Sequence, residues 1–323
     1  MLLLFAVRNC PAQLLSGLPQ AQVSECDYCG CSQGISPLET GSTGIRFEFG
    51  SLYLGAPYNG SLRQTTAIGK NESFITNKLT LFYRLDPTSP FTLAAAVPYV
   101  NRVSQDPGGN GAPIQTAKGN GLGDIAVTLR YNHLHHVDES TIAFSAGFGV
   151  KFPTGKDNIL VGANYLDPDL QPGTGTTDLL FNIAGFWSLD RFGVAGNLTA
   201  GVITGPGAPE SDGNHKYGNY INGDLTFRYR VIPADASESN LSVMFGIGAE
   251  NRAHETEGGQ MIIPSGGSII YVAPGLKYIV STQISADATF QIPVYQYLGW
   301  NPDTGDNQLG QNYRFVAGIQ YRL

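Results

Sequence analysis

The sequence YRFVAGIQYRL, residues 313–323, alternates between apolar and polar or small side chains. Successive side chains of a β-strand point to opposite faces of the sheet, so this segment is predicted to be a strand with one apolar face. That face has aromatic residues near both ends, whereas the other face carries Arg314, Gln320 and Arg322. Aromatic residues at both ends of an apolar band are typical of strands that contact lipid, so the segment predicts an outer-membrane β-barrel.

The same period of two recurs along the chain, and the connections alternate between short and long. An even strand number with short turns on one side is typical of single-chain bacterial barrels, and it places both termini in the periplasm. A soluble β-sandwich or a large lipocalin-like barrel is the alternative, but twelve strands exceed an ordinary sandwich. The fold class is therefore predicted to be all-β, an antiparallel up-and-down transmembrane barrel. The predicted strands are 43–55, 73–84, 91–103, 122–133, 140–153, 177–189, 192–204, 216–231, 240–254, 268–279, 283–295 and 312–323, with 134–139 among the short links and 154–176 among the long ones.

Composition and charge agree with a barrel made of strands and turns. Only 14% of the 323 residues are charged, and the chain has 41 glycines and a net charge of −7. This charge argues against nucleic acid as a partner, which requires a basic face. The longest apolar run, MLLLFAV at the N-terminus, is far shorter than a membrane-spanning helix. We expect a weak or truncated signal peptide over 1–21, a periplasmic segment over 22–42, and a barrel over 43–323 in the Gram-negative outer membrane, with the lipid bilayer as its surroundings.

Several short sequences resemble a family of outer-membrane transporters named for the MetA pathway of phenol degradation. The similar pieces are VPYVNR at Val97, GLGDIAVTLRY at Gly121, GVKFPTGK at Gly149, LQPGTGTTDLL at Leu170 and FQIPVYQ at Phe290. They occur in the family's order between residues 75 and 323. The resemblance implies a β-barrel with a transport role and no catalytic residues. Only the family's name suggests phenolic or other hydrophobic solutes.

Three cysteines, Cys26, Cys29 and Cys31, form the sequence CDYCGC before the first predicted strand. Their thiolates could hold a soft metal ion such as Cu(I), or share a zinc ion with a fourth ligand. An oxidised pair with one spare thiol is the alternative, because the export route is oxidising. At the periplasmic mouth of the barrel, the segment could also dock a redox or electron-transfer protein. His133, His135 and His136 are expected in a polar turn on the same side.

The inward positions of the predicted strands carry eleven basic and six acidic residues, although the whole chain is acidic. A ring of basic residues in a narrow lumen favours anions, because the low-dielectric wall concentrates the field on a permeating ion. The alternative is a lattice of internal salt bridges that fills the barrel. The residues predicted to form the basic lining are Arg46, Arg84, Arg130, Arg228, Arg230, Lys277 and Arg322.

No catalytic motif is found, because the chain lacks a GxSxG elbow and its histidines are assigned to turns and loops. His215 and His254, like the loop residues Asp157, Asp167 and Asp169, are expected to be solvated. The sequence therefore predicts a non-enzymatic channel for small solutes, hydrophobic, aromatic or anionic. A barrel scaffold whose CDYCGC segment binds a metal or a periplasmic partner is the second prediction, and a purely structural protein is the third.

Overall fold

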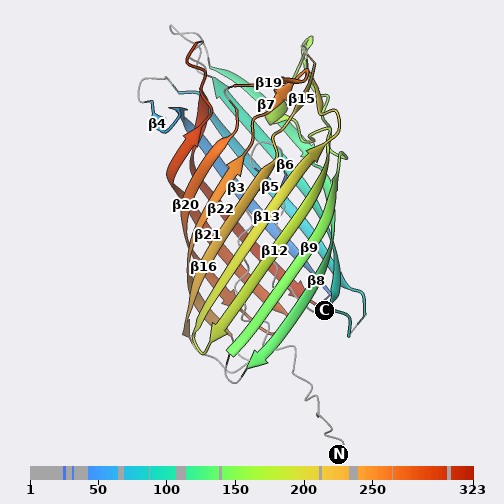
Figure 1. The fold of residues 1–323 in the computed structure, drawn as a ribbon, viewed down its shortest axis with the longest axis vertical. Helices are drawn as coiled ribbons and strands as arrows, with labels where there is room; N and C mark the ends of the chain where they lie inside the picture. Colours follow the sequence, from blue (N-terminus) through green and yellow to red (C-terminus); the bar gives the residue numbers. More distant parts are fainter. Residues whose placement is uncertain are drawn as a thin grey trace, which may run out of the picture.

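The computed structural model consists almost entirely of β-strands that form one closed barrel (Figure 1). Within the described part, no helix is long and apolar enough to cross a membrane. The structure describes residues 25–26, 31–32, 43–64, 69–86, 88–106, 114–137, 140–210, 213–232, 239–263, 265–303 and 307–323.

Twelve antiparallel strands form the wall, and each pairs with its neighbours in the sequence. The last strand pairs with the first, from Arg322 opposite Gly44 to Gln308 opposite Tyr58, and this pairing closes the barrel. The predicted fold class is thus confirmed. The wall strands are β3 (Gly44–Asn59), β5 (Asn71–Arg84), β6 (Phe91–Asp106), β8 (Ile125–Val137), β9 (Ser140–Phe152), β12 (Thr177–Leu189), β13 (Phe192–Thr204), β16 (Tyr220–Ile232), β17 (Asn240–Arg252), β20 (Gly267–Ile279), β21 (Ile284–Leu298) and β22 (Gln308–Arg322).

The wall has an apolar outer surface and a polar inner surface. On β3, Ile45 and Phe47 are exposed on the outside, whereas Arg46 and Glu48 are buried on the inside. The strict alternation along the strand sends every second side chain to the lumen. A soluble protein would bury such apolar side chains, so an outer surface of this kind requires lipid.

The two ends of the barrel differ, and we call them the turn end and the loop end. The turn end has short links, such as the tight turn of Asp190 and Arg191 between β12 and β13, where Asp190 has a φ of 47°. The C-terminus lies at this end (Figure 1). The predicted link at 134–139 is too long, because β8 continues to Val137. His133, His135 and His136 therefore lie in a strand rather than in the predicted turn.

The long links at the loop end contain short strands that the period of two did not predict. β14 (Ala208–Glu210), β15 (Gly213–Lys216), β18 (Thr256–Glu257) and β19 (Gln260–Met261) form a separate four-stranded sheet. β7 (Gln115–Leu122) extends the wall by pairing with β6, and β4 (Leu62–Arg63) pairs with β3. The link between β9 and β12 contains β10 (Leu160–Val161), β11 (Asn164–Tyr165) and the 3₁₀ helix η3 (Pro168–Leu170).

Candidate functional site

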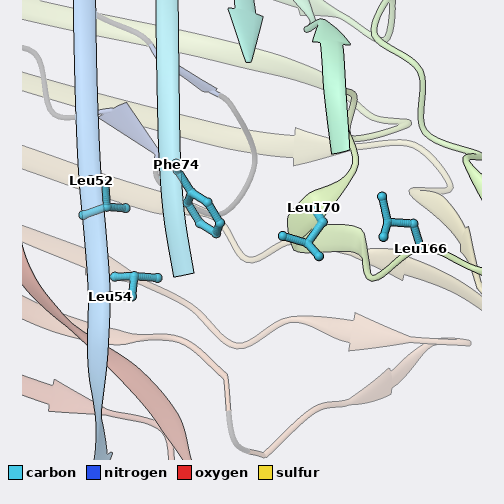
Figure 2. Packing of buried hydrophobic residues seen from close by; sticks show 5 residues of the cluster. All are labelled: Leu52, Leu54, Phe74, Leu166 and Leu170. Carbon is cyan, nitrogen blue, oxygen red and sulfur yellow. The ribbon is translucent and has the colours of Figure 1, made fainter. Parts of the chain in front are cut away.

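The link between β9 and β12, residues 153–176, folds into the lumen at the loop end, and we call it the inserted link. Its Leu166 and Leu170 are buried against Leu52, Leu54 and Phe74 of the wall strands β3 and β5. Figure 2 shows Leu52, Leu54 and Phe74 on the two wall strands, with Leu170 and Leu166 of the link to one side of them. Burying apolar side chains against the wall holds the link inside the barrel, because the alternative is contact with water. The prediction of a solvated loop is therefore wrong for most of residues 166–176, although Asp167 is exposed as predicted.

Arg102 of β6 anchors the inserted link to the wall. Its Nη1 donates hydrogen bonds to the carbonyl oxygens of Asp169 (2.8 Å) and Gln171 (3.0 Å). The side chain of the buried Gln171 then binds the rest of the link, because its amide nitrogen donates to the carbonyl oxygens of Ile159 and Leu166. β7 lies so close to η3 that a Cβ atom at Gly119 would collide with the carbonyl oxygen of Leu170. This approach requires glycine at position 119.

A buried ionic network fixes the base of the inserted link. Lys151 Nζ lies 3.3 Å from a carboxylate oxygen of Asp124 and 2.7 Å from one of Asp178, and all three side chains have no exposed surface. Asp124 accepts hydrogen bonds from the backbone and hydroxyl of Thr174, and Asp178 accepts one from Thr176. One cation thus stabilises two carboxylates, and the remaining oxygens accept hydrogen bonds from the backbone N–H of Gly155 and the hydroxyl of Thr176. Such complete pairing is what allows charges to be buried.

Carboxylates gather where the inserted link approaches the opposite wall. Asp169 of η3 interacts electrostatically with Asp167, with Glu72 of β5, and with Glu255, which follows β17. β5 and β17 are not neighbours in the sheet, so this acidic group spans the lumen. Burial raises the pKa of Asp169 well above its ordinary value, and the neighbouring carboxylates raise that pKa further.

His215 also belongs to this region, and the prediction that it is solvated is wrong. It is only 6% exposed, its Nε2 lies 3.3 Å from a carboxylate oxygen of Glu255, and its ring packs edge-on against Tyr217. Beside Glu255 lies a small pocket with a volume of about 50 Å³, lined in part by Asn222, Glu250 and Arg252. Glu250 accepts a hydrogen bond of 2.8 Å from Arg314 across the lumen. The loop end of the lumen therefore brings several carboxylates close together.

The turn end of the lumen has a lattice of ion pairs on one side. Arg46 binds Asp287 with two hydrogen bonds of 2.8 and 3.0 Å, and its Nε donates to Glu48 at 3.2 Å. Lys78 lies 2.5 Å from the other oxygen of Glu48. The two cations and two anions of this lattice balance each other. This part of the lumen matches the alternative prediction of an internal salt-bridge lattice.

The predicted basic lining is otherwise only partly brought together. Lys277 interacts electrostatically with Arg46, Arg228 and Arg322, so these residues form one group around it. Arg84 lies apart, because its Nε donates to the carbonyl oxygen of Ser89 in the neighbouring turn. Whether this lining selects anions stays a prediction. Arg46, Arg130, Arg228 and Lys277 are buried in the lumen, whereas Arg84, Arg230 and Arg322 are half-buried near its end.

The cysteine segment is described in part. β1 (Glu25–Cys26) pairs with β2 (Cys31–Ser32), which places Cys26 and Cys31 directly opposite each other in the backbone register. Cys29 lies outside the described residues. Across the part of the chain that the structure describes, no group of three or more His, Cys, Asp and Glu side chains is placed to hold a metal ion.

Two features of the lumen were not predicted from the sequence. Arg102 continues the inward alternation of β6 but lies near the end of the predicted strand, where its partner in the link could not be foreseen. Phe186 of β12 also faces the lumen, with its ring centre 5.9 Å from the guanidinium carbon of Arg228. An aromatic residue at an inward position was a signal that the alternation itself provided.

A solved outer membrane structure shares this fold. An outer membrane channel from Pseudomonas putida F1 superposes with a TM-score of 0.65 at 13% identity, covering 94% of this chain and 100% of the other. The beta domain of the Bordetella autotransporter BrkA gives a TM-score of 0.46 at 10% identity, with coverages of 87% and 100%. No curated protein matches the sequence.

A family model matches residues 76–298, which is well over half of the chain. The matched region runs from β5 to the end of β21 and includes the inserted link together with Arg102, Lys151 and Arg228. The chain belongs to the family described as "Putative MetA-pathway of phenol degradation".

Proposed function

We propose that the protein is an outer-membrane channel for small solutes. The observation that carries this proposal is a closed barrel with an apolar outside, a polar lumen, and a link folded inward to narrow it. Membrane barrels with polar interiors provide a route for solutes, and an inserted loop sets the size of that route. The family match and the fold shared with the Pseudomonas channel support the proposal.

In this proposal the loop end faces the outside and the turn end faces the periplasm. Single-chain bacterial barrels have their long loops outside and their short turns in the periplasm. The first wall strand begins at the turn end and the last wall strand ends there, since Gly44 pairs with Arg322. Both ends of the barrel domain would therefore face the periplasm. A solute would then meet the acidic group first and the basic group last.

The proposal assigns a transport role rather than a catalytic one. The acidic and basic side chains of the lumen are largely paired with one another or with the inserted link. A catalytic acid or base needs a reacting group within hydrogen-bond reach. Pairing of this kind stabilises a narrow lumen instead.

Single-channel recording of the refolded, full-length protein in a planar bilayer tests the proposed function. We expect discrete conductance steps that scale with salt concentration, with small unit size because the inserted link narrows the lumen. Protein shown by gel mobility to be folded and inserted, but electrically silent in every salt, would contradict the channel. If the protein conducts, liposome swelling with different small solutes would show which solutes it prefers.

A second candidate function is a barrel scaffold whose N-terminal segment binds a metal ion or docks a periplasmic redox partner. The opposition of Cys26 and Cys31 in a short antiparallel pair favours it, because it brings two of the three cysteines together. Replacing Cys26, Cys29 and Cys31 with serine should then abolish Cu(I) or zinc binding by the isolated protein while leaving conductance unchanged. Equal metal content in the serine variant would remove this candidate.

A further inference from the structure

The lumen-facing side of β16 and β17 near the turn end is cationic without a balancing acid. Arg228 and Arg230 project from β16, and Asn240, Ser242 and Met244 are buried on β17. Within the described residues, neither arginine forms an ion pair with a carboxylate. Arg228 is 3% exposed, yet its Nε and Nη1 have no hydrogen-bond partner among these residues, and neither has the hydroxyl of Ser242.

Lys277 of β20 completes this cationic patch. The strand register places Ser242 opposite both Arg230 and Lys277, and Lys277 interacts electrostatically with Arg228. Asp287, which lies opposite Lys277 in the register and attracts it, also accepts two hydrogen bonds from Arg46. A buried guanidinium without a counter-ion is energetically costly, so an anion that enters the lumen gains by binding there.

An apolar wall borders the same arginine. Phe186 forms a buried cluster with Ala143 and Ala195, and its ring lies beside the Arg228 guanidinium. The two side chains meet over Gly193, where a Cβ atom would touch both the ring and the Arg228 Nε. An inorganic anion would use the arginine alone. A carboxylate joined to an aromatic ring would use both surfaces, since aromatic rings pack favourably against each other.

We propose that Arg228, with Arg230, Lys277 and Ser242, forms a binding subsite for an aromatic monocarboxylate whose ring packs on Phe186. The planar fork of a guanidinium matches the two oxygens of a carboxylate, and Ser242 supplies a further hydroxyl donor. The inference rests on the proposed function only in that the lumen is the path of the solute. The inference adds the chemical class of solute that binds at the turn end of this path.

Equilibrium binding of benzoate to the full-length protein folded in detergent tests the subsite. Isothermal titration calorimetry should give a Kd for benzoate at least about tenfold lower than for phenol, which lacks the charge, or for acetate, which lacks the ring. Arg228→Gln should raise the Kd for benzoate about tenfold. Phe186→Leu should raise the Kd for benzoate while leaving the Kd for acetate unchanged. Lys118→Gln, which removes a charge at an exposed position of β7, is the matched control. It should leave the Kd values for benzoate, phenol and acetate unchanged.

Three results would overturn the subsite. Benzoate could bind no tighter than phenol, the two variants could bind benzoate as the original protein does, or phosphate could bind more tightly than benzoate. The last result would indicate a site for inorganic anions. Heat-modifiable gel mobility shows that each variant is folded, and Phe186→Leu keeps every charge if Arg228→Gln fails to fold.

Liposome swelling, measured in parallel, separates this inference from the proposed function. Saturable benzoate binding by a protein that passes no solute would retain the subsite and contradict the channel. Solute flux without saturable benzoate binding would retain the channel and overturn the subsite.

Discussion

At the loop end of the lumen the buried Lys151 lies between two carboxylates, whereas at the turn end the buried Lys277 lies among arginines. Both side chains have almost no exposed surface, and both come from wall strands with the same inward alternation. The first lysine belongs to a network that fixes the inserted link. The second belongs to a group with more cations than anions. The same residue type is therefore held between two carboxylates in one region and surrounded mainly by cations in the other.

The largest expected effect is a difference in protein stability between variants of the two lysines. Lys151→Met leaves Asp124 and Asp178 buried without their cation and should lower the free energy of unfolding by about 3–5 kcal/mol. Lys277→Met removes repulsion as well as attraction and should cost less than about 2 kcal/mol. Urea titration of the folded protein in lipid vesicles measures both. Equal losses would contradict the comparison between the two ends.

The next effect concerns the inserted link. Arg102→Met keeps much of the packing but loses two hydrogen bonds to carbonyl oxygens, each contributing roughly 1.5–3 kcal/mol because the donor is charged. The undocked link should therefore become at least about tenfold more populated. Single-channel recordings should show this as a larger conductance state that is occupied more often. Arg63→Met, in the exposed strand β4, is the control, and an equal change there would refute the anchor.

Charge-neutralising substitutions at the two ends should change ion selectivity in opposite directions. Neutralising Arg130 and Arg228 with glutamine should lower the anion-over-cation permeability ratio, whereas Glu255→Gln at the loop end should raise it. A unit charge about 4 Å from an ion in water contributes about 1 kcal/mol, so each change should alter the ratio about fivefold. Reversal potentials across a KCl gradient measure the ratio. An unchanged reversal potential in the arginine variant would show that the basic lining does not select anions.

The smallest effect is a pH dependence at the loop end. The raised pKa of Asp169 means that the folded link binds a proton more tightly than the unfolded chain does. Docking is therefore strongest below the ordinary Asp pKa of about 3.9 and weakens as the pH rises through the raised pKa. The larger conductance state should become more frequent over this range.

Asp169→Asn should remove this dependence, because the amide does not titrate. Asp303→Asn, in an exposed loop position, should retain it. A pH profile that is unchanged in Asp169→Asn would assign the titration to another group.

The sequence predicted the wall well and the contents of the lumen poorly, for a physical reason. The alternation at Ile45, Arg46, Phe47 and Glu48 is a local signal, because each position reports directly which side of the wall it faces. The inserted link has no such period. Its glycines, prolines and aspartates are equally common in solvated loops. The partners of Leu170 lie on β3 and β5, and those on β3 are more than a hundred residues earlier in the chain. Insertion therefore depended on contacts that only the closed barrel creates.

The pairing of β22 with β3 joins the two ends of the barrel sequence, whereas every other pair in the wall joins consecutive wall strands. Contacts at this separation carry the largest loop-closure entropy and are expected to form last during folding. Until they form, β3 and β22 each present an open edge of backbone donors and acceptors, which lipid cannot satisfy. The final seam between Gly44 and Arg322 is thus the step on which completion of the barrel in a bilayer depends.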